Sequence, residues 1–479
     1  MNIEDYKIVG GLSKEQMDKM HENALWLCEN VGINVPHEGI VNILSSYDGV
    51  KVENKNIVKF KPEIILNALK QAKYDLPEYA KDKDSWIISA GAHQTACYDL
   101  NNLGKIKEAD TGDLINFIKL GDALDTVGSA PVVPLDVPVH LQHILMHKVA
   151  YEYSRFRCND IYEHMDKPTY ECANYVYEMA KVADKRFAFG VWMISPRSFD
   201  AKGLDVAYKL LDKGVPMWIA TMPVAGVSSP ITMLGTIQQS IFEYLAGLAM
   251  LNLINRKSFN YISPNDAFEG DAFDMKYSTF VYGSVEYIEH TLYQIPLCHY
   301  YNVPVMTKTL LTASKQPDAQ AAAEIGMHTL IAALMGARAF RCGGLLSTGE
   351  LYSGEWLVIV KEMVEYIKNI IKPQKFSCER LMVEEIAEVG PGQSFIGRKS
   401  TIENFKKEYW QPELFVHSNL GQWQEMGSKS IVQYANELAK KRIKEHTYQI
   451  DPDKKKELDK IYEIANKDIK LIDSFKVKI

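Results

Sequence analysis

Residues 187–220 read FAFGVWMISPRSFDAKGLDVAYKLLDKGVPMWIA, and their pattern indicates the architecture of the whole chain. Apolar residues fill 187–194 and 216–220, which are predicted strands, while the amphipathic stretch 200–213 between them is a predicted helix. A strand, a helix and a second strand in this order give parallel strands joined by a right-handed crossover. The pattern therefore predicts a parallel α/β fold.

The same alternation continues on both sides of this unit. Short apolar segments recur as predicted strands at 127–133, 158–162, 259–262, 304–307 and 339–342. Longer amphipathic segments alternate with them as predicted helices at 140–155, 169–183, 232–256, 284–301, 318–335 and 353–371. For the helix at 232–256, Ser229 is the predicted N-cap and Pro230 the first-turn residue. Seven strand–helix units are therefore predicted.

An eighth strand would close this arrangement into a (β/α)8 TIM barrel. Residues 86–100 or residues 278–282 could supply it, and the apolar residues around Gly91 suggest a hairpin in the first of these. An open, doubly wound sheet is the alternative architecture. It is disfavoured because no glycine-rich phosphate turn follows the first strand, and the glycine-rich run 343–349 matches no phosphate motif.

Helical extensions flank the predicted barrel. The first 80 residues look helical: Ser13 and Gln16 form a capping box ahead of one helix, and Pro62 begins another. Beyond Pro373 the chain is more polar, and surface helices are expected there.

The C-terminal helices are expected at 399–409 and 428–444, and the amphipathic tail 451–479 is expected to be a packing arm without chemistry. We therefore divide the chain into an N-terminal helical extension (1–85), a (β/α)8 catalytic barrel (86–372) and a C-terminal helical extension (373–479).

The composition excludes several functional classes. The chain has 479 residues and a formal net charge of −7, so it lacks the basic excess that nucleic-acid binding requires. The polar N-terminus does not resemble a signal peptide, and no apolar run reaches the ~18 residues that a membrane span needs. The seven cysteines contain no C-x-x-C pair, which indicates reduced thiols. We expect a cytoplasmic protein that binds neither nucleic acid nor membrane.

His140, His143 and His147 form the strongest metal-like pattern. Their i, i+3, i+7 spacing places three imidazoles on one face of a helix, as a zinc site could use. The same helix carries apolar residues, and no familiar cysteine or carboxylate motif lies nearby in the sequence. Packing is therefore the favoured interpretation, and no metal site is expected.

Gln320, Glu324 and His328 share one face of another predicted helix. Helix bodies lie outside the mouth of a barrel, where the chemistry occurs. These side chains are therefore expected to bond neighbouring helices or a second subunit rather than to catalyse. Residues at strand ends, such as Ser195 and Lys308, are better placed for function.

Four stretches of the chain resemble the trimethylamine methyltransferase superfamily. The most informative is PVAGVSSPIT at 223–232, followed by EYLAG at 243–247. The others are GLS at 11–13, DAQ at 318–320 with MGAR at 335–338, and EVGPGQSF at 388–395. The stretches occur in the family's order and span residues 8–440. Because the sequence has only standard residues, it is similar to the members that lack pyrrolysine.

The resemblance implies a (β/α)8 barrel with helical additions. Members of the superfamily move a methyl group from a methylated amine to the cobalt of a corrinoid that a separate protein carries. Pyrrolysine-free members of known activity act on quaternary amines, so the expected substrate is glycine betaine, proline betaine, carnitine or γ-butyrobetaine. The chain lacks the Asp-x-His-x-x-Gly pattern of corrinoid-binding domains. The cobamide is therefore expected on the partner protein, with no cofactor on this chain.

The chemistry of such a reaction agrees with the absence of an acid–base motif. A quaternary ammonium that loses a methyl group leaves as a neutral tertiary amine, so the leaving group needs no proton. The partner's Co(I) is the nucleophile, and the protein supplies positioning and electrostatics. A non-catalytic binding barrel and a barrel lyase acting on a small cation are the alternatives. A homo-oligomer is also expected.

Aromatic side chains near the predicted strand ends are candidates for holding the ammonium group, because aromatic faces attract cations. The cage candidates are Tyr98, Trp192, Tyr261 and Tyr352. A substrate carboxylate needs a polar or basic group, and the candidates for that role are His93, Gln94 and Arg341.

Overall fold

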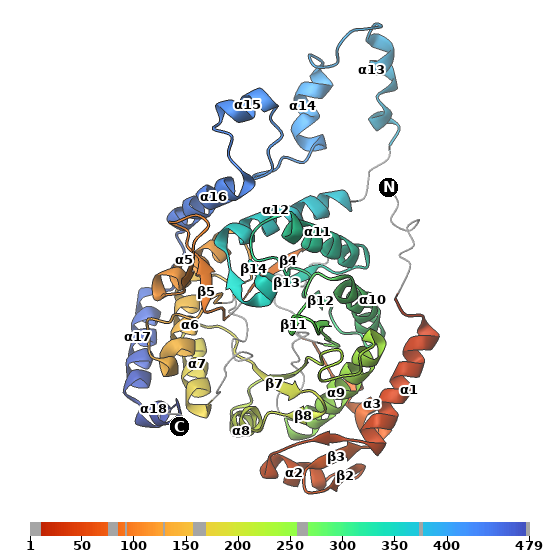
Figure 1. The fold of residues 1–479 in the computed structure, drawn as a ribbon, viewed down its shortest axis with the longest axis vertical. Coiled ribbons are helices and arrows are strands. Elements are labelled where there is room, and N and C mark those ends of the chain that lie inside the picture. The colour runs from red at the N-terminus through yellow and green to blue at the C-terminus, as the bar shows by residue number, and fades with distance from the viewer. Residues whose placement is uncertain are drawn as a thin grey trace.

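The protein is a mixed α/β molecule in which helices surround short strands (Figure 1). The computed structural model describes residues 11–74, 85–91, 93–127, 130–156, 169–255, 267–372 and 377–475. The predicted α/β alternation is confirmed over these residues. The predicted strands at 158–162 and 259–262 lie outside them.

The N-terminal segment combines helices with a small sheet. The capping box of Ser13 and Gln16 is confirmed ahead of α1 (Lys14–Asn30), and α3 (Pro62–Gln71) begins at Pro62 as predicted. An entirely helical segment, however, is a wrong prediction. Between these helices lie β1 (Ile33–Asn34), α2 (Glu38–Ser45), β2 (Val50–Glu53) and β3 (Ile57–Phe60).

A tight turn explains this difference. Asn54 and Lys55 both adopt left-handed backbone angles, with φ of 49° and 72°, and they join β2 to β3 as an antiparallel hairpin. The loop between the paired residues Glu53 and Ile57 has three residues, a common length for a tight hairpin. Val58 and Phe60 of β3 are fully buried, so burial in the folded molecule stabilises the hairpin.

Parallel strands form the centre of the molecule. β7 (Phe189–Ile194) pairs with β9 (Met217–Thr221), and β12 (Met306–Thr307) pairs with β13 (Ala339–Gly343). The four corresponding strand predictions are confirmed. In the predicted strand at 127–133, Val127 and Val132 form isolated parallel bridges to Ser89 and Gln94.

Residues 86–100 supply a further parallel strand. β4 (Ile87–Ala90) pairs with β13, with Ile88 opposite Phe340. Residues 278–282, the other candidate region, instead contribute to an antiparallel pair. In this pair β10 (Phe273–Asp274) lies beside β11 (Thr279–Phe280). Of the two candidate regions, residues 86–100 therefore supply the parallel strand, β4.

The hairpin predicted around Gly91 is wrong. β4 does not pair with β5 (Ala96–Tyr98); β5 pairs with β6 (Ile106–Glu108). The reversal occurs after Asp99, whose carboxylate accepts a hydrogen bond from the Asn101 backbone N–H at 2.8 Å, and Gly104 provides a φ of +82°. The apolar residues on the two sides of Gly91 belong to different sheets.

Three sheets carry the parallel pairs. The six-stranded sheet has the order β2-β3-β1-β8-β7-β9, where β8 is Ser198–Phe199. The three-stranded sheet is β12-β13-β4. The four-stranded sheet is β14-β15-β5-β6, with β14 at Leu345–Leu346 and β15 at Leu351–Tyr352. The N-terminal hairpin therefore extends the same sheet that holds β7 and β9.

The predicted helices of the central region are confirmed within a few residues at each end. They are α6 (Val139–Tyr153), α7 (Tyr170–Val182), α8 (Ala201–Leu210), α9 (Met233–Ile254), α10 (Val285–Tyr300), α11 (Ala319–Leu334) and α12 (Gly354–Ile370). α5 (Thr111–Ala123) was not predicted, although Asp110 and Asp113 form a capping box at its start.

The predicted N-cap of α9 is wrong by one turn. Thr232 is the cap, and its hydroxyl accepts a hydrogen bond from the Gly235 N–H at 3.1 Å. Ser229 belongs to the preceding turn, where its backbone N–H donates to the Val224 carbonyl at 3.1 Å. A residue engaged in that turn cannot also begin the helix.

The C-terminal region is helical. It consists of α13 (Val383–Glu388), α14 (Lys399–Glu408), α15 (Leu420–Glu425), α16 (Ile431–Glu445), α17 (Pro452–Lys467) and α18 (Ile469–Phe475). The tail packs on the body, since Leu458, Ala465 and Leu471 are fully buried. α13, α14 and α15 instead lie apart from the body (Figure 1). Among the described residues, no helix combines the length and the apolar character of a membrane span.

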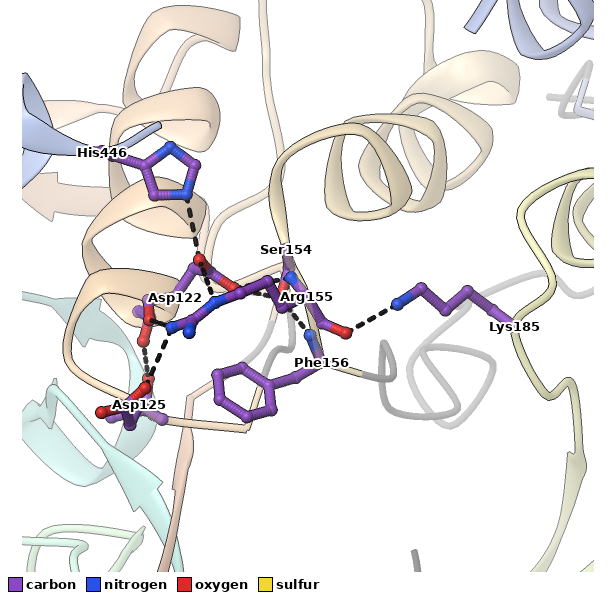
Figure 2. A network of polar contacts seen from close by, with 9 residues as sticks. Asp122, Asp125, Ser154, Arg155, Phe156, Lys185 and His446 are labelled. Atoms are coloured by element: carbon purple, nitrogen blue, oxygen red, sulfur yellow. Dashed lines mark hydrogen bonds and ion pairs between the residues drawn. The ribbon is translucent and has the colours of Figure 1, made fainter. Parts of the chain in front are cut away.

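A buried carboxylate ties the tail to the body (Figure 2). Asp122, at the end of α5, is 2% exposed and accepts hydrogen bonds from the Arg155 backbone N–H at 2.6 Å and its Nε at 3.0 Å. Its Oδ2 also lies 3.0 Å from Nε2 of His446. Asp122 therefore joins α5, the end of α6 and the residue after α16.

Candidate functional site

The segments that follow β9 and β12 meet at residues 267–272, at the carboxyl ends of these two strands. The turn after β9 lies beside residues 267–272: Val224 and Asp271 form a parallel bridge, and the Asp271 N–H donates to the Pro223 carbonyl at 3.0 Å. The PVAGVSSPIT stretch thus holds an acidic segment in place. Because the carboxyl ends of parallel strands carry function in α/β folds, this edge is the candidate site.

Two buried carboxylates lie at this edge. Glu269 and Asp271 are 1% and 0% exposed. Lys308, directly after β12, places its Nζ 3.5 Å from Oε2 of Glu269. A buried charge is costly unless opposite charge or hydrogen bonds compensate it. The site therefore concentrates charge where a charged ligand can be recognised.

α10 orients the segment that carries Glu269. Gln294 Nε2 donates to Oε1 of Glu269 at 3.2 Å and to the Ala267 carbonyl at 3.0 Å. One turn earlier, His290 Nε2 lies 3.1 Å from the Phe268 carbonyl. Burial lowers the pKa of His290 to about 4, so its imidazole is neutral at pH 7 and its Nε2–H donates a hydrogen bond to that carbonyl. Gln294 and His290, one helical turn apart on α10, thus fix the position of the segment that carries the Glu269 carboxylate.

Aromatic rings adjoin the acidic pair. The rings of Phe280 and Tyr282 are stacked at 5.7 Å, and Tyr282 meets the edge of Tyr287 at 5.1 Å. Burial raises the pKa of the Tyr282 phenol well above its usual range, and the negative charge of Asp271 raises it further, while Lys308 acts in the opposite direction. The backbone brings the two segments together, because the N–H of the neighbouring Val281 donates to the Ala272 carbonyl at 3.2 Å. Aromatic faces beside carboxylates are suited to a cation.

Two helix carboxylates hold the surrounding loops. Glu324 of α11 accepts hydrogen bonds from the Thr312 hydroxyl and from the Ala313 N–H, the latter at 3.0 Å, which fixes the loop after β12. Glu243 of α9 accepts from the Ser195 hydroxyl at 2.6 Å and the Arg197 N–H at 2.7 Å, which fixes the loop after β7. Glu243 belongs to the EYLAG stretch and Glu324 lies between the DAQ and MGAR stretches, and both position loops.

Four of the seven predicted binding residues lie on the four-stranded sheet or in the segment that leads into its strand β5. Gln94 donates from Nε2 to the Gly349 carbonyl at 2.8 Å, and His93 precedes it with a φ of 62°. The Tyr98 hydroxyl donates to the Lys315 carbonyl at 2.9 Å. Tyr352, on the neighbouring strand, is fully buried and meets Phe117 edge-to-face at 4.8 Å. These residues stay candidates for substrate contact.

The other three predicted residues are placed elsewhere. Trp192 lies on β7 and packs against Trp218 at 6.3 Å, in the six-stranded sheet. Arg341 lies on β13, in the three-stranded sheet. Tyr261 falls outside the described residues.

Sequence reasoning missed Glu269 and Asp271. One signal was available: three carboxylates, at 266, 269 and 271, directly follow the predicted strand at 259–262. That pattern is weak in isolation because acidic residues are common in solvated loops. Burial distinguishes Glu269 and Asp271, and it follows from contacts with α10 and the turn after β9, which are distant in the sequence.

The helical histidines are packed as interpreted. His147 Nδ1 lies 2.9 Å from the His143 carbonyl, and burial lowers its pKa to about 3. His328 Nε2 lies 2.6 Å from the Thr291 hydroxyl on α10, which agrees with the expected bonding between helices. Within the described ranges, no group of three or more His, Cys, Asp or Glu side chains is arranged to hold a metal.

The protein has an α/β fold with a cluster of buried acidic and aromatic residues near the ends of its strands. Such a cluster is suited to binding a small cationic molecule. The sequence profile described as trimethylamine methyltransferase (MTTB) matches residues 2–468. The chain belongs to this family of methyltransferases.

Three named relatives show how far the similarity extends. A glycine betaine methyltransferase of Desulfitobacterium hafniense is 24% identical over 86% of this chain and 88% of its own length. A trimethylamine methyltransferase MttB of the same species is 23% identical over 93% of this chain and 92% of its own. For MttB of Methanosarcina thermophila the identity is 28%, over 60% of each chain.

Among solved structures, the monomethylamine methyltransferase MtmB of Methanosarcina barkeri is similar to this chain with a TM-score of 0.47 and 10% identity. The similarity covers 98% of this chain and 89% of MtmB.

Proposed function

We propose that this protein removes a methyl group from a quaternary, betaine-like amine and transfers it to the Co(I) of a corrinoid carried by a separate protein. The observation that carries the proposal is the buried pair Glu269 and Asp271, which lies next to the PVAGVSSPIT turn and whose segment is hydrogen-bonded to the one that carries Tyr282. A permanently charged ammonium gains from buried carboxylates and aromatic faces, whereas a neutral amine gains less. The similarity to a glycine betaine methyltransferase supports the same substrate class.

The proposed reaction is balanced without a protein acid or base. The C–N bond breaks, its electron pair stays on nitrogen, and the neutral tertiary amine leaves. The corrinoid supplies the electron pair that forms the new bond to the methyl carbon. The chain's own residues bind the ammonium, orient its methyl group towards the corrinoid and exclude water.

The proposed architecture is a closed (β/α)8 barrel. Its strands would be β4, the segment at 127–133, 158–162, β7, β9, 259–262, β12 and β13 in chain order. The parallel pairs β7–β9, β12–β13 and β13–β4 and the bridge from Ser89 to Val127 support this order. In such a barrel Trp192 and Arg341 would approach the acidic cluster from different strands.

The substrate contacts in the proposal combine both sets of residues. The ammonium would lie near Glu269, Asp271 and Tyr282, with Trp192, Tyr98, Tyr261 or Tyr352 completing the cage. A substrate carboxylate would be bound by Arg341, His93 or Gln94. We also place the reaction in the cytoplasm, where free thiols such as Cys298, whose pKa is raised by burial, stay reduced.

The decisive experiment is a substrate panel. Purified chain is mixed with a reduced corrinoid protein and with glycine betaine, proline betaine, carnitine, γ-butyrobetaine or trimethylamine, and methyl-Co(III) absorbance is followed. We expect methylation with at least one quaternary amine and none with trimethylamine. Methylation by trimethylamine alone, or consumption of a betaine without the corrinoid protein as a lyase would give, would contradict the proposal.

A further inference from the structure

The C-terminal arm, which we define as residues 377–430, has no core of its own. α13, α14 and α15 bury none of their residues, and Leu414 is the one buried residue of the arm, all of which the structure describes. Burial of apolar surface must offset the entropy lost when a chain is ordered, and this arm buries almost none. Its helices therefore need an external surface to pack against.

Ion pairs orient the arm without replacing a core. Arg398 contacts Glu385 at 3.0 Å and also Glu388, and Arg380 contacts Glu408 at 2.5 Å. Partly exposed pairs of this kind contribute ~0–1 kcal/mol each. They set the angle between α13 and α14 but leave the apolar side chains in water.

The arm exposes a large apolar surface. Its most exposed large side chains, between 57% and 82% accessible, are Val383, Ile386, Ile396, Ile402, Tyr409 and Leu420. At about 100 Å² per aliphatic side chain and about 200 Å² for the tyrosine, these six expose on the order of 500 Å². That is the size of the largest apolar patch on a typical monomer, ~300–600 Å², which is often a functional surface.

α14 presents this surface in an ordered way. Ile402 and Phe405 lie one turn apart on one face of the helix, and the exposed Tyr409 follows directly after its last residue. The arm carries eight acidic and six basic residues, so its charge is nearly balanced. A nearly neutral apolar face suits another apolar surface rather than an oppositely charged partner.

A complementary groove lies where the arm joins the body. This α11–α12 groove has a volume of about 530 Å³ and is lined mainly by apolar residues, including Leu330, Met363 and Ile367. Phe415, from the returning end of the arm, borders it. Its described lining includes no residue of α13, α14 or α15, although the arm leaves the body just beyond Ile370 at the groove's edge. The three helices point away from it (Figure 1).

We propose that the arm docks on a second copy of this chain, with α14 seated in the α11–α12 groove of that copy. One chain carries both the exposed apolar face and the groove. Two copies related by a two-fold axis can exchange arms reciprocally, which covers both surfaces and closes the assembly. The proposal does not depend on the methyl-transfer reaction.

Light scattering on the full chain tests the association. Ile402→Asp introduces a charge on the α14 face, and Ile464→Asp on α17 is a matched control, because the two isoleucines are 61% and 58% exposed. We expect the parent and Ile464→Asp to have the mass of two chains or a multiple, and Ile402→Asp to have a lower mass. Ala322→Arg, at an exposed position of the groove, should lower the mass in the same way.

Cross-linking between isotopically labelled and unlabelled copies tests the contact itself. Links from Lys406 on α14 to Lys368 on α12 are expected between a labelled and an unlabelled chain. A monomeric parent, a mass unchanged by both Ile402→Asp and Ala322→Arg, or links confined to one copy would overturn the proposal. A monomer that uses the arm to capture a corrinoid protein would overturn it too.

Discussion

At the scale of single residues, the site depends on charges that are buried and held in place. Gln294 and His290 fix Glu269 from α10, and the turn after β9 fixes Asp271. A rigid buried carboxylate attracts a cation more strongly than a solvated one because little water screens it. We therefore expect the acidic pair to distinguish charged from neutral ligands.

Glu269→Gln tests this expectation. The change keeps the shape of the side chain and removes its charge. We predict a Kd for the preferred betaine that is roughly 10–100 times higher, since the loss of a buried charged contact of about 1.5–3 kcal/mol corresponds to that factor. Titration calorimetry measures the affinity. The control ligand is an uncharged tert-butyl analogue, whose binding should change little; an equal loss for both ligands would refute a charge effect.

Gly283 tests the role of Glu324 in holding the loops. A Cβ at this position would lie 2.6 Å from Oε2 of Glu324, and its φ is +79°. Gly104 has a similar φ of +82° with nothing within 4 Å of a Cβ, so Gly104→Ala is the matched control. The left-handed conformation costs an alanine roughly 1–2 kcal/mol in both variants.

We predict that Gly283→Ala lowers the thermal stability more than Gly104→Ala and reduces kcat/KM at least ~5-fold, because the loop after β12 shifts with Glu324. Gly104→Ala should keep the parent kcat/KM. Equal stability and activity in the two variants would show that Glu324 does not anchor the site.

At the scale of elements, local patterns located the helices well and their caps less well. The seven central helices follow from apolar periodicity, which needs only residues within a few turns. The N-cap of α9 depends on how the preceding turn folds, because Val224 engages Ser229 and leaves Thr232 to begin the helix. The hairpin at β2–β3 was missed for a related reason, since its short strands are stabilised by burial rather than by their own pattern.

Thr232→Ala tests the observed cap. Removing the hydroxyl leaves the Gly235 N–H without its acceptor, so we predict a loss of about 0.5–2 kcal/mol in the free energy of unfolding. Scanning calorimetry at fixed pH measures it as a lower Tm. Thr232→Ser retains the hydroxyl and should stay near the parent; a Tm unchanged in the alanine variant would mean that another residue caps α9.

At the scale of the whole molecule, buried groups join parts of the chain that are far apart in sequence. Asp122 links α5 and α6 to His446, and β1 attaches the N-terminal hairpin to the central sheet through β8. Buried histidines contribute to the pH dependence of this packing. Burial lowers the pKa of His147, His290 and His328 to about 3, 4 and 3, below the ordinary value of about 6.5.

The sign of the pH effect follows from proton uptake. Below pH 6.5 the unfolded chain binds protons on these histidines while the folded chain does not, so stability falls with decreasing pH by up to about 1.4 kcal/mol per pH unit for each histidine. Burial raises the pKa of Glu243, so the folded chain takes up a proton on this carboxylate at a higher pH than the unfolded chain does. This uptake raises the stability as the pH falls, which is opposite to the effect of the histidines. We predict a falling Tm from pH 7 to pH 5. His147→Gln should make that fall shallower, and a flat profile in the parent would refute the mechanism.

The sequence by itself determined the alternation of strands and helices in the central region and the family. Those properties reside in local periodicity and short motifs, which do not depend on which segments become neighbours. Tertiary structure alone decided that β4 lies beside β13, that Glu269 and Asp271 are buried against Lys308 and Tyr282, and that the C-terminal arm stands away from the body. The physical reason is that burial and charge compensation arise between residues far apart in the chain, so a local pattern carries no record of them.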